Sequence, residues 1–432
     1  MTTVLIIFAL TYILIASERI DKAAAVFFGT AFVVMFDVAP YTKLLGYIDL
    51  NVIYLLVGMM IIVGVLAATG IFEWIAITLA QAAKGNGMMI MVLFLCATAL
   101  LSAFLDNVTT VILVAPITIL VTQILEIPTV PLLILEAIFS NIGGTSTLVG
   151  DPPNVIIGSQ AGLTFNDFLF NLTPPVAGIA IVTLAILAYW MRKSVRVAED
   201  IKSRVMRAHP DKAIVDAKGL RRALPVFFLV IAGFMTGHYF HLEAGLVAIV
   251  GALVMAVVTG QSVHDLLEKV EWATIFFFMG LFMLIGAMEY RGVFEWLGGE
   301  VIAATRGNLL ATCLAVLWVS AIFSAIVDNI PLVIAMIPLI KHIIPGFAAS
   351  MGLADPQIVA VEIAEPLYWS LALGACLGGN GSLIGASANV VISQIARRNQ
   401  YHLSFWDFTR YGFPLMILSV AISSVYICVR YF

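Results

Sequence analysis

Charged residues are scarce in this chain of 432 residues: 11% are Asp, Glu, Lys or Arg, whereas 62% are hydrophobic. Soluble domains carry a charge on about a quarter of their residues, so this composition excludes an ordinary water-soluble fold. The mean hydropathy of +1.07 predicts instead an all-α polytopic membrane protein. A basic segment and a small-residue cleavage site are missing from the N-terminus, so residues 3–17 are interpreted as a first span.

Motifs typical of enzymes are missing too. There is no glycine-rich phosphate loop ending in Lys-Ser/Thr, which excludes a built-in ATPase, and no spacing typical of metal ligands or of a nucleophile and its base. The cysteines lie in apolar stretches and match no zinc or disulfide pattern. They are Cys96, Cys313, Cys376 and Cys428. We therefore expect no enzyme, no cofactor, no metal site and no nucleic-acid partner.

What the chain does contain is an internal repeat. Residues 51–116 recur 222 positions later, with 19 identities in 66 positions and no gap. Beyond them the offset changes to 235. The corresponding residues are Trp74 and Trp296, Asp106 and Asp328, Asn107 and Asn329, Gly143 and Gly378, and Asn154 and Asn389. Two copies of an apolar unit, interrupted by polar segments at matching places, are typical of a secondary transporter with its site between the repeats.

Ten apolar stretches approach or exceed the roughly 20 residues that cross a bilayer as a helix. They are 3–17, 22–38, 51–68, 131–160, 174–191, 223–240, 243–260, 272–290, 366–396 and 411–430. Among them, 131–160 and 366–396 are broken by Gly and Pro. Two further stretches, 88–124 and 308–345, carry Asp-Asn at their middles and are predicted to be re-entrant hairpins. Each half then has five crossings, so the two halves form an inverted repeat.

Basic residues predict the orientation. The connection 192–222, between the first repeat (1–191) and the second (223–432), carries ten Lys and Arg and should be cytoplasmic. The same topology places Lys22 inside and both termini outside the cell inner (plasma) membrane. The basic loop is expected to touch anionic lipid. The alternative is a cytosolic partner such as an ATPase subunit.

The hairpin tips and the helix breaks hold the candidate site. Each tip has Asp-Asn where a carboxylate is expensive, although capping of the next helix is the simpler interpretation. In the first break, Asp151 stands where the second break has Ala386, so the half-sites are not equivalent. The predicted substrate-binding residues are Asn107, Thr109, Thr145, Ser146, Thr147, Asn154, Asn329, Asn380, Ser382, Ser387 and Asn389. The predicted proton- or cation-coupling residues are Asp106, Asp151 and Asp328. Apart from Lys341, no Lys or Arg is expected in the cavity.

Several of these motifs resemble the ion transporter superfamily, and within it the ArsB/NhaD/P-protein group with its citrate-transporter-like domain. They are 106–110, 141–144 and 150–154, while 374–381 and 384–389 are especially similar to the pink-eyed-dilution (P) proteins. The resemblance implies a homodimer, a scaffold made by the early helices of each half, and a mobile part that moves by elevator-type alternating access. The dicarboxylate branch has Ser-Asn-Thr at the tips, from which this chain departs.

These features lead to a hypothesis of proton-coupled efflux of arsenite or antimonite, because undissociated arsenite is a small neutral solute that suits amide and hydroxyl groups. A sodium/proton antiporter is the first alternative. An anion channel or carboxylate transporter is the second.

Overall fold

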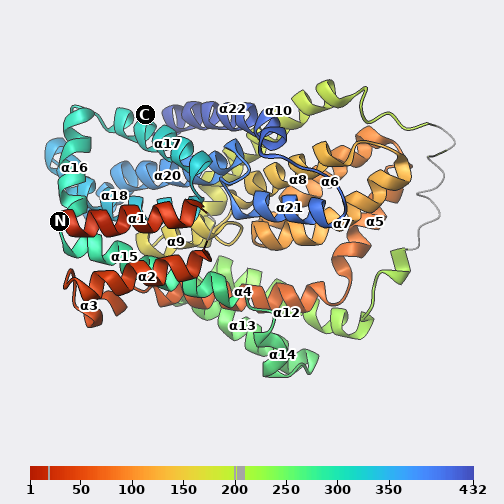
Figure 1. The fold of residues 1–432 in the computed structure, drawn as a ribbon, viewed down its shortest axis with the longest axis horizontal. Coiled ribbons are helices and arrows are strands. Elements are labelled where there is room, and N and C mark those ends of the chain that lie inside the picture. Colours follow the sequence, from red (N-terminus) through yellow and green to blue (C-terminus); the bar gives the residue numbers. More distant parts are fainter. Residues whose placement is uncertain (18–19, 199–200, 202–209) are drawn as a thin grey trace.

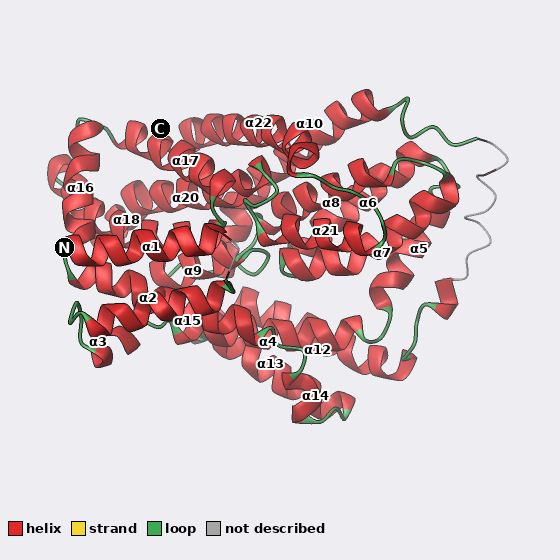
Figure 2. Ribbon diagram, in the orientation of Figure 1, coloured by secondary structure: helices red, strands yellow, loops and turns green. Residues whose placement is uncertain are grey.

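The protein is helical, and the computed structural model describes residues 1–17, 20–198, 201 and 210–432 without any strand among them (Figures 1 and 2). Within these ranges, nine helices are long and apolar enough to cross a membrane, and shorter apolar helices accompany them. The predicted all-helical polytopic fold is confirmed. Arg19 and parts of the basic connection, residues 199–200 and 202–209, lie outside the described residues.

The helices before and after the basic connection follow the same order. The first set is α1 (Thr2–Ser17), α2 (Lys22–Met35), α3 (Tyr41–Leu45), α4 (Leu50–Ala67), α5 (Ile71–Ala82), α6 (Gly87–Ser102), α7 (Asn107–Leu125), α8 (Thr129–Gly144), α9 (Pro152–Ala161) and α10 (Phe165–Met191). The second set is α12 (Ala217–Thr236), α13 (Ala244–Thr259), α14 (Val263–Leu267), α15 (Trp272–Tyr290), α16 (Val293–Ala304), α17 (Leu309–Ile326), α18 (Asn329–Met351), α19 (Pro356–Val359), α20 (Glu365–Gly378), α21 (Ser387–Arg398) and α22 (Phe405–Tyr431). The 3-10 turn η1 (Pro210–Lys212) lies in the basic connection. Two further 3-10 turns, η2 (Gly237–Phe240) and η4 (Gly379–Gly381), and a π-helical turn, η3 (Ala360–Ala364), complete the second set.

Two hairpins enter the molecule from opposite ends. Helices α6 and α7 lie on the right of Figure 1 and turn near its middle, whereas α17 and α18 approach from the left. The interrupted helices run alongside them: α8 packs on α6, and α20 packs on α17. The part of each interrupted helix after the break packs on the hairpin of the other repeat: α9 contacts α18, and α21 contacts α7. Both turns and both breaks therefore meet at the centre of the molecule.

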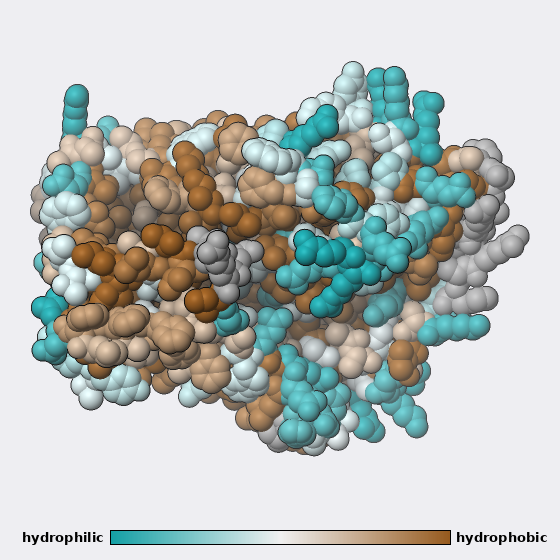
Figure 3. Space-filling view, viewed as in Figure 1, coloured by the Kyte–Doolittle hydropathy of each residue, from teal (hydrophilic) through white to brown (hydrophobic). Residues whose placement is uncertain are grey.

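A second layer is formed by the early helices of each half. Helix α4 packs along α13, which also contacts α12, and α15 packs along α2. The α4–α13 contact requires a glycine, because a Cβ on Gly58 would lie 2.5 Å from the carbonyl carbon of Ala248. Figure 3 shows apolar side chains over the half that contains α1 and α2. Leu10 and Phe28 on these helices are exposed, as expected for surfaces that face lipid.

Three helices begin earlier than predicted. Helix α10 begins at Phe165 instead of 174, α22 at Phe405 instead of 411, and α12 at Ala217 instead of 223. The first two start at capping boxes, Thr164 with Asp167 and Ser404 with Asp407, whose polar residues resemble a loop in sequence. Prolines lie inside both helices, which membrane-spanning helices tolerate.

Two connections between the predicted apolar stretches are shorter than the sequence pattern indicates. Between 131–160 and 174–191 only residues 162–164 are not helical, and beyond the stretch 308–345 helix α18 continues to Met351. The predicted hairpins and breaks agree closely with α6–α7, α17–α18, α8–α9 and α20–α21.

Candidate functional site

A cavity of about 270 Å³ lies where the hairpin tips meet the helix breaks. Its polar lining comes from both repeats and from the start of α15. The polar side chains are Asp106, Asn107, Asn141, Asp151, Glu271, Thr274, Asn329 and Ser387. Asn107 and Asn329, one from each tip, both line this cavity.

The first tip is closed on itself. The Asp106 carboxylate accepts a hydrogen bond of 2.9 Å from the backbone N–H of Thr109 and another from its hydroxyl, so it caps α7. Asn107 is 4% exposed, and its Oδ1 accepts a 2.5 Å hydrogen bond from Ser102. The simpler interpretation of Asp106 as a helix cap is thus what its geometry shows, although the residue still lines the cavity.

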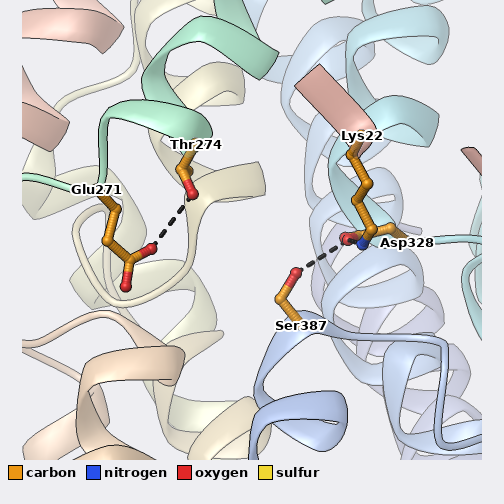
Figure 4. A network of polar contacts seen from close by, with 5 residues as sticks. All are labelled: Lys22, Glu271, Thr274, Asp328 and Ser387. Atoms are coloured by element: carbon orange, nitrogen blue, oxygen red, sulfur yellow. Dashed lines mark hydrogen bonds and ion pairs between the residues drawn. The ribbon is translucent and has the colours of Figure 1, made fainter. Parts of the chain in front are cut away.

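The second tip has the same two residues in different surroundings. Asp328 precedes α18 but its side chain makes no capping bond. Instead, Oδ2 forms an ion pair of 2.8 Å with Nζ of Lys22 and accepts a 2.9 Å hydrogen bond from Ser387 (Figure 4). A nearby bond, from the Tyr12 hydroxyl to the Pro331 carbonyl, also joins the first helix pair to this hairpin. The same Asp-Asn pair therefore has different partners at the two tips.

Asp151 occupies the centre between the two tips. It precedes α9 without capping it, and its side chain is 2% exposed. Oδ1 accepts a long hydrogen bond of 3.5 Å from Asn329, and Oδ2 has no partner among the described residues. An ionised carboxylate in this position is costly unless a proton or a cation neutralises it.

Asparagines hold the two breaks together. Nδ2 of Asn154 donates to the carbonyls of Thr145 and Thr147, at 3.0 and 2.9 Å. Its counterpart Asn389 does the same in the second break, with the carbonyls of Gly379 and Ser382. Asn141 then joins the two repeats, donating 2.8 and 3.1 Å hydrogen bonds to Oδ1 of Asn380 and of Asn389. Asn141 lines the cavity, and Asn154, Asn380 and Asn389 lie behind its lining.

The hydroxyls predicted to bind substrate bond to the protein instead. Thr145 and Ser146 donate to carbonyls one turn back, at Asn141 and Gly143. Thr147 and Ser382 donate across to the carbonyls of Ala103 and Ala325, at the ends of α6 and α17. Of the predicted site residues, Asp106, Asn107, Asp151, Asn329 and Ser387 line the cavity, and Thr109, Thr145, Ser146, Thr147, Asn154, Asp328, Asn380, Ser382 and Asn389 do not.

Four residues of the site were not among the predicted ones: Lys22, Asn141, Glu271 and Thr274. The expectation that Lys341 is the cavity's basic residue was wrong. Lys341 does not line the cavity, and its Nζ bonds Gln160 on α9 at 3.0 Å. Lys22, assigned from the sequence to a cytoplasmic turn, pairs with Asp328 at the second tip. Glu271 precedes α15 and accepts a 3.2 Å hydrogen bond from Thr274 (Figure 4). Burial removes water from the Glu271 carboxyl group and, together with the negative charge of Asp106, raises the pKa of Glu271.

A larger cavity of about 710 Å³ lies between α4, α9, α12 and α13, and none of the tip residues lines it. A narrow gap separates it from the central cavity. Leu55 and Val155 line both the gap and the large cavity, whereas Asp106 and Pro152 line both the gap and the central cavity. The three spaces therefore follow one another between the two helix layers, with an apolar constriction between them.

Comparison with known proteins assigns the chain to a family. Residues 12–374 match the CitMHS citrate transporter family. An uncharacterized transporter of Mycobacterium tuberculosis is 44% identical over 99% of this chain and 97% of its own length. The P protein of Sus scrofa is 32% identical over all of this chain, which spans 59% of that protein's length. The YdaH transporter of Alcanivorax borkumensis has a similar structure, with a TM-score of 0.63, 13% identity, and coverage of 90% of this chain and 87% of that one.

The chain therefore belongs to the citrate transporter family and is a multi-pass membrane transporter. The resemblance to the P-protein group within the ion transporter superfamily is confirmed.

Proposed function

We propose that this member of the citrate transporter family is a proton-coupled secondary transporter, with Asp151 as its proton carrier and a small solute without net negative charge as its substrate. Undissociated arsenite or antimonite, moved outward by elevator-type alternating access, is the substrate that we place first. The hairpins and broken helices would form the moving part against the layer of α4, α12 and α13.

The buried carboxylate of Asp151 is the observation that carries the proposal. It has one oxygen without a partner among the described residues and one long hydrogen bond, from Asn329 of the opposite repeat. Residues of both tips line the same cavity as this group, which must be neutralised by a proton or a cation, as expected for a coupling site. The corresponding Ala386 makes the cavity asymmetric, with one such group instead of two.

The charge of the lining supports a neutral substrate. Asp106, Asp151 and Glu271 line the cavity, and the only basic group described beside it, Lys22, is paired with Asp328. A free polycarboxylate would be repelled by these carboxylates, because like charges repel strongly where water is scarce. Citrate, the substrate named for the family, would need to arrive with a cation. The same repulsion argues against an anion channel.

A sodium/proton antiporter is the second candidate. Asp106 and Glu271 present oxygen ligands to the same cavity as Asp151, and carboxylate oxygens are ligands suited to a hard cation. In this case sodium would compete with the proton at Asp151.

Transport by purified protein in proteoliposomes tests both candidates. An imposed pH gradient should drive flux of arsenite or antimonite, and Asp151→Asn should abolish proton coupling. Asp216→Asn is the matched control, because Asp216 is an exposed cap of α12 outside the site. Sodium-driven proton movement without metalloid flux would favour the antiporter. Wild-type coupling in Asp151→Asn would refute the assignment of the proton carrier.

The remaining partners expected from the sequence stay predictions. They are a homodimer, anionic lipid at the basic connection, and a cytosolic ATPase subunit. The predicted inside location of 192–222 and outside location of both termini are likewise proposals.

A further inference from the structure

We propose that Lys22 is a built-in counter-cation that fills the half-site of the second repeat, so that the carrier exchanges a cation only beside the first repeat's break. The inference rests on the proposed transport role of the central cavity. It assigns Lys22 a role in setting how many ions move in each cycle, and it removes Asp328 from the groups that release a cation.

The contacts of Asp328 carry this inference. The residue is 5% exposed and holds both the ammonium of Lys22, at 2.8 Å, and the hydroxyl of Ser387, at 2.9 Å. Oδ1 has no partner among the described residues. A carboxylate with one open oxygen, next to a hydroxyl, offers oxygen ligands that suit a small cation. Here the ammonium of Lys22 occupies that place.

Lys22 comes from the other helix layer. It is the first residue of α2, which packs against α15, whereas Asp328 directly precedes α18 and Ser387 begins α21. The ammonium therefore reaches the half-site from outside the hairpins and breaks, as an ion from solution would (Figure 4). Unlike such an ion, it cannot leave with the substrate.

In the part of the chain that the structure describes, no Lys or Arg is paired with the corresponding Asp106 of the first repeat. Helix α13 occupies the place of α2 in the second set of helices and begins at Ala244. Among the described residues Asp106, the counterpart of Asp328, bonds Thr109 and caps α7. Asp151 is present on that side, and Ala386 replaces it on the other. The second repeat has thus lost one carboxylate and neutralised another, which leaves the exchangeable charge beside the first break.

Equilibrium binding of radioactive sodium to purified protein at alkaline pH tests the inference. Lys22→Gln should bind one further sodium ion per protomer relative to wild type, because the freed carboxylate then needs a counter-ion. Lys22→Arg keeps the positive charge and should keep the wild-type stoichiometry. In Lys22→Gln combined with Asp328→Asn the additional ion should disappear.

Two results would overturn the inference: folded Lys22→Gln with wild-type sodium stoichiometry, or additional sodium that persists in the double variant. Removal of a structural ion pair alone would lower thermal stability without adding a bound ion. If Lys22→Gln cannot be purified, the double variant Lys22→Gln with Asp328→Asn is used instead. The number of ions moved per substrate is then measured from the reversal potential in proteoliposomes and compared with wild type. An unchanged ratio supports the inference, and a lower ratio shows that Asp328 exchanges ions. Failure of the proposed function would appear separately, as absence of coupled transport by wild type.

Discussion

Replacing Gly143 by Ala should displace the first hairpin and stop transport. A Cβ at this position would lie 2.0 Å from the carbonyl oxygen of Ala99 on α6, where ordinary contact begins near 3.4 Å. The obstacle is backbone, so no change of side-chain rotamer relieves it, and α6 must move by more than 1 Å. Overpacking of this kind costs roughly 1–3 kcal/mol, and a rigid obstacle places the cost at the upper end.

The displacement matters for function because α6 leads directly to the tip that carries Asp106 and Asn107. A shift of that size is large compared with the tolerance of a site built from hydrogen bonds near 3 Å. We expect the variant to be recovered folded, to unfold several degrees lower in a size-exclusion thermal assay, and to lose coupled transport in proteoliposomes.

The matched control is Gly178→Ala, in the interior of α10, where the added Cβ meets nothing within 4 Å. Because glycine is a poor helix former, this change should raise stability by roughly 0.5–1 kcal/mol and leave transport intact. Equal effects of the two substitutions would refute the close packing of α6 on α8. Normal transport by Gly143→Ala would show that the tip need not hold this position.

Two further substitutions test the support of the site. Asn154→Ala leaves the buried carbonyls of the first break without their donor and should cost roughly 2–3 kcal/mol, whereas Asn399→Ala, at an exposed asparagine with one bond, should cost well under 1 kcal/mol in the same thermal assay. Glu271→Gln should remove a pH dependence: the pKa of Glu271 is raised on folding, so wild-type stability falls as pH rises from the ordinary pKa of Glu through the raised value. The unfolding temperature should fall less steeply with rising pH in Glu271→Gln than in wild type. An equal fall in both would contradict the raised pKa of Glu271.

The architecture was predictable because its signals are local or periodic. Apolar stretches of bilayer length, glycine pairs, and the recurrence of Asp-Asn at a fixed offset are all visible along the chain. Helix starts were less predictable, since a capping box such as Thr164 with Asp167 looks like loop sequence until the helix that it caps is seen.

The residues in and beside the cavity could be predicted from the sequence only in part. Residues at the tips and breaks carry the repeat, so Asn107 and Asn329 could be paired from the sequence. Lys22 is 306 positions from Asp328, and Glu271 lies in a connection before α15. Neither belongs to a recurring motif, and a basic residue between two apolar stretches is ordinarily assigned to a loop. Only the tertiary packing shows that the first helix pair brings an ammonium to the second tip.

The hydroxyls show the reverse error. Thr145, Ser146 and Thr147 follow a glycine pair and look like free ligands, yet a broken helix leaves carbonyls that must find donors away from water. The nearest hydroxyls supply them. At a membrane-buried break, polar residues are therefore first claimed by the backbone. The residue to suspect of transport is a carboxylate that lines the cavity and keeps an oxygen without a partner among the described residues, and Asp151 meets both conditions.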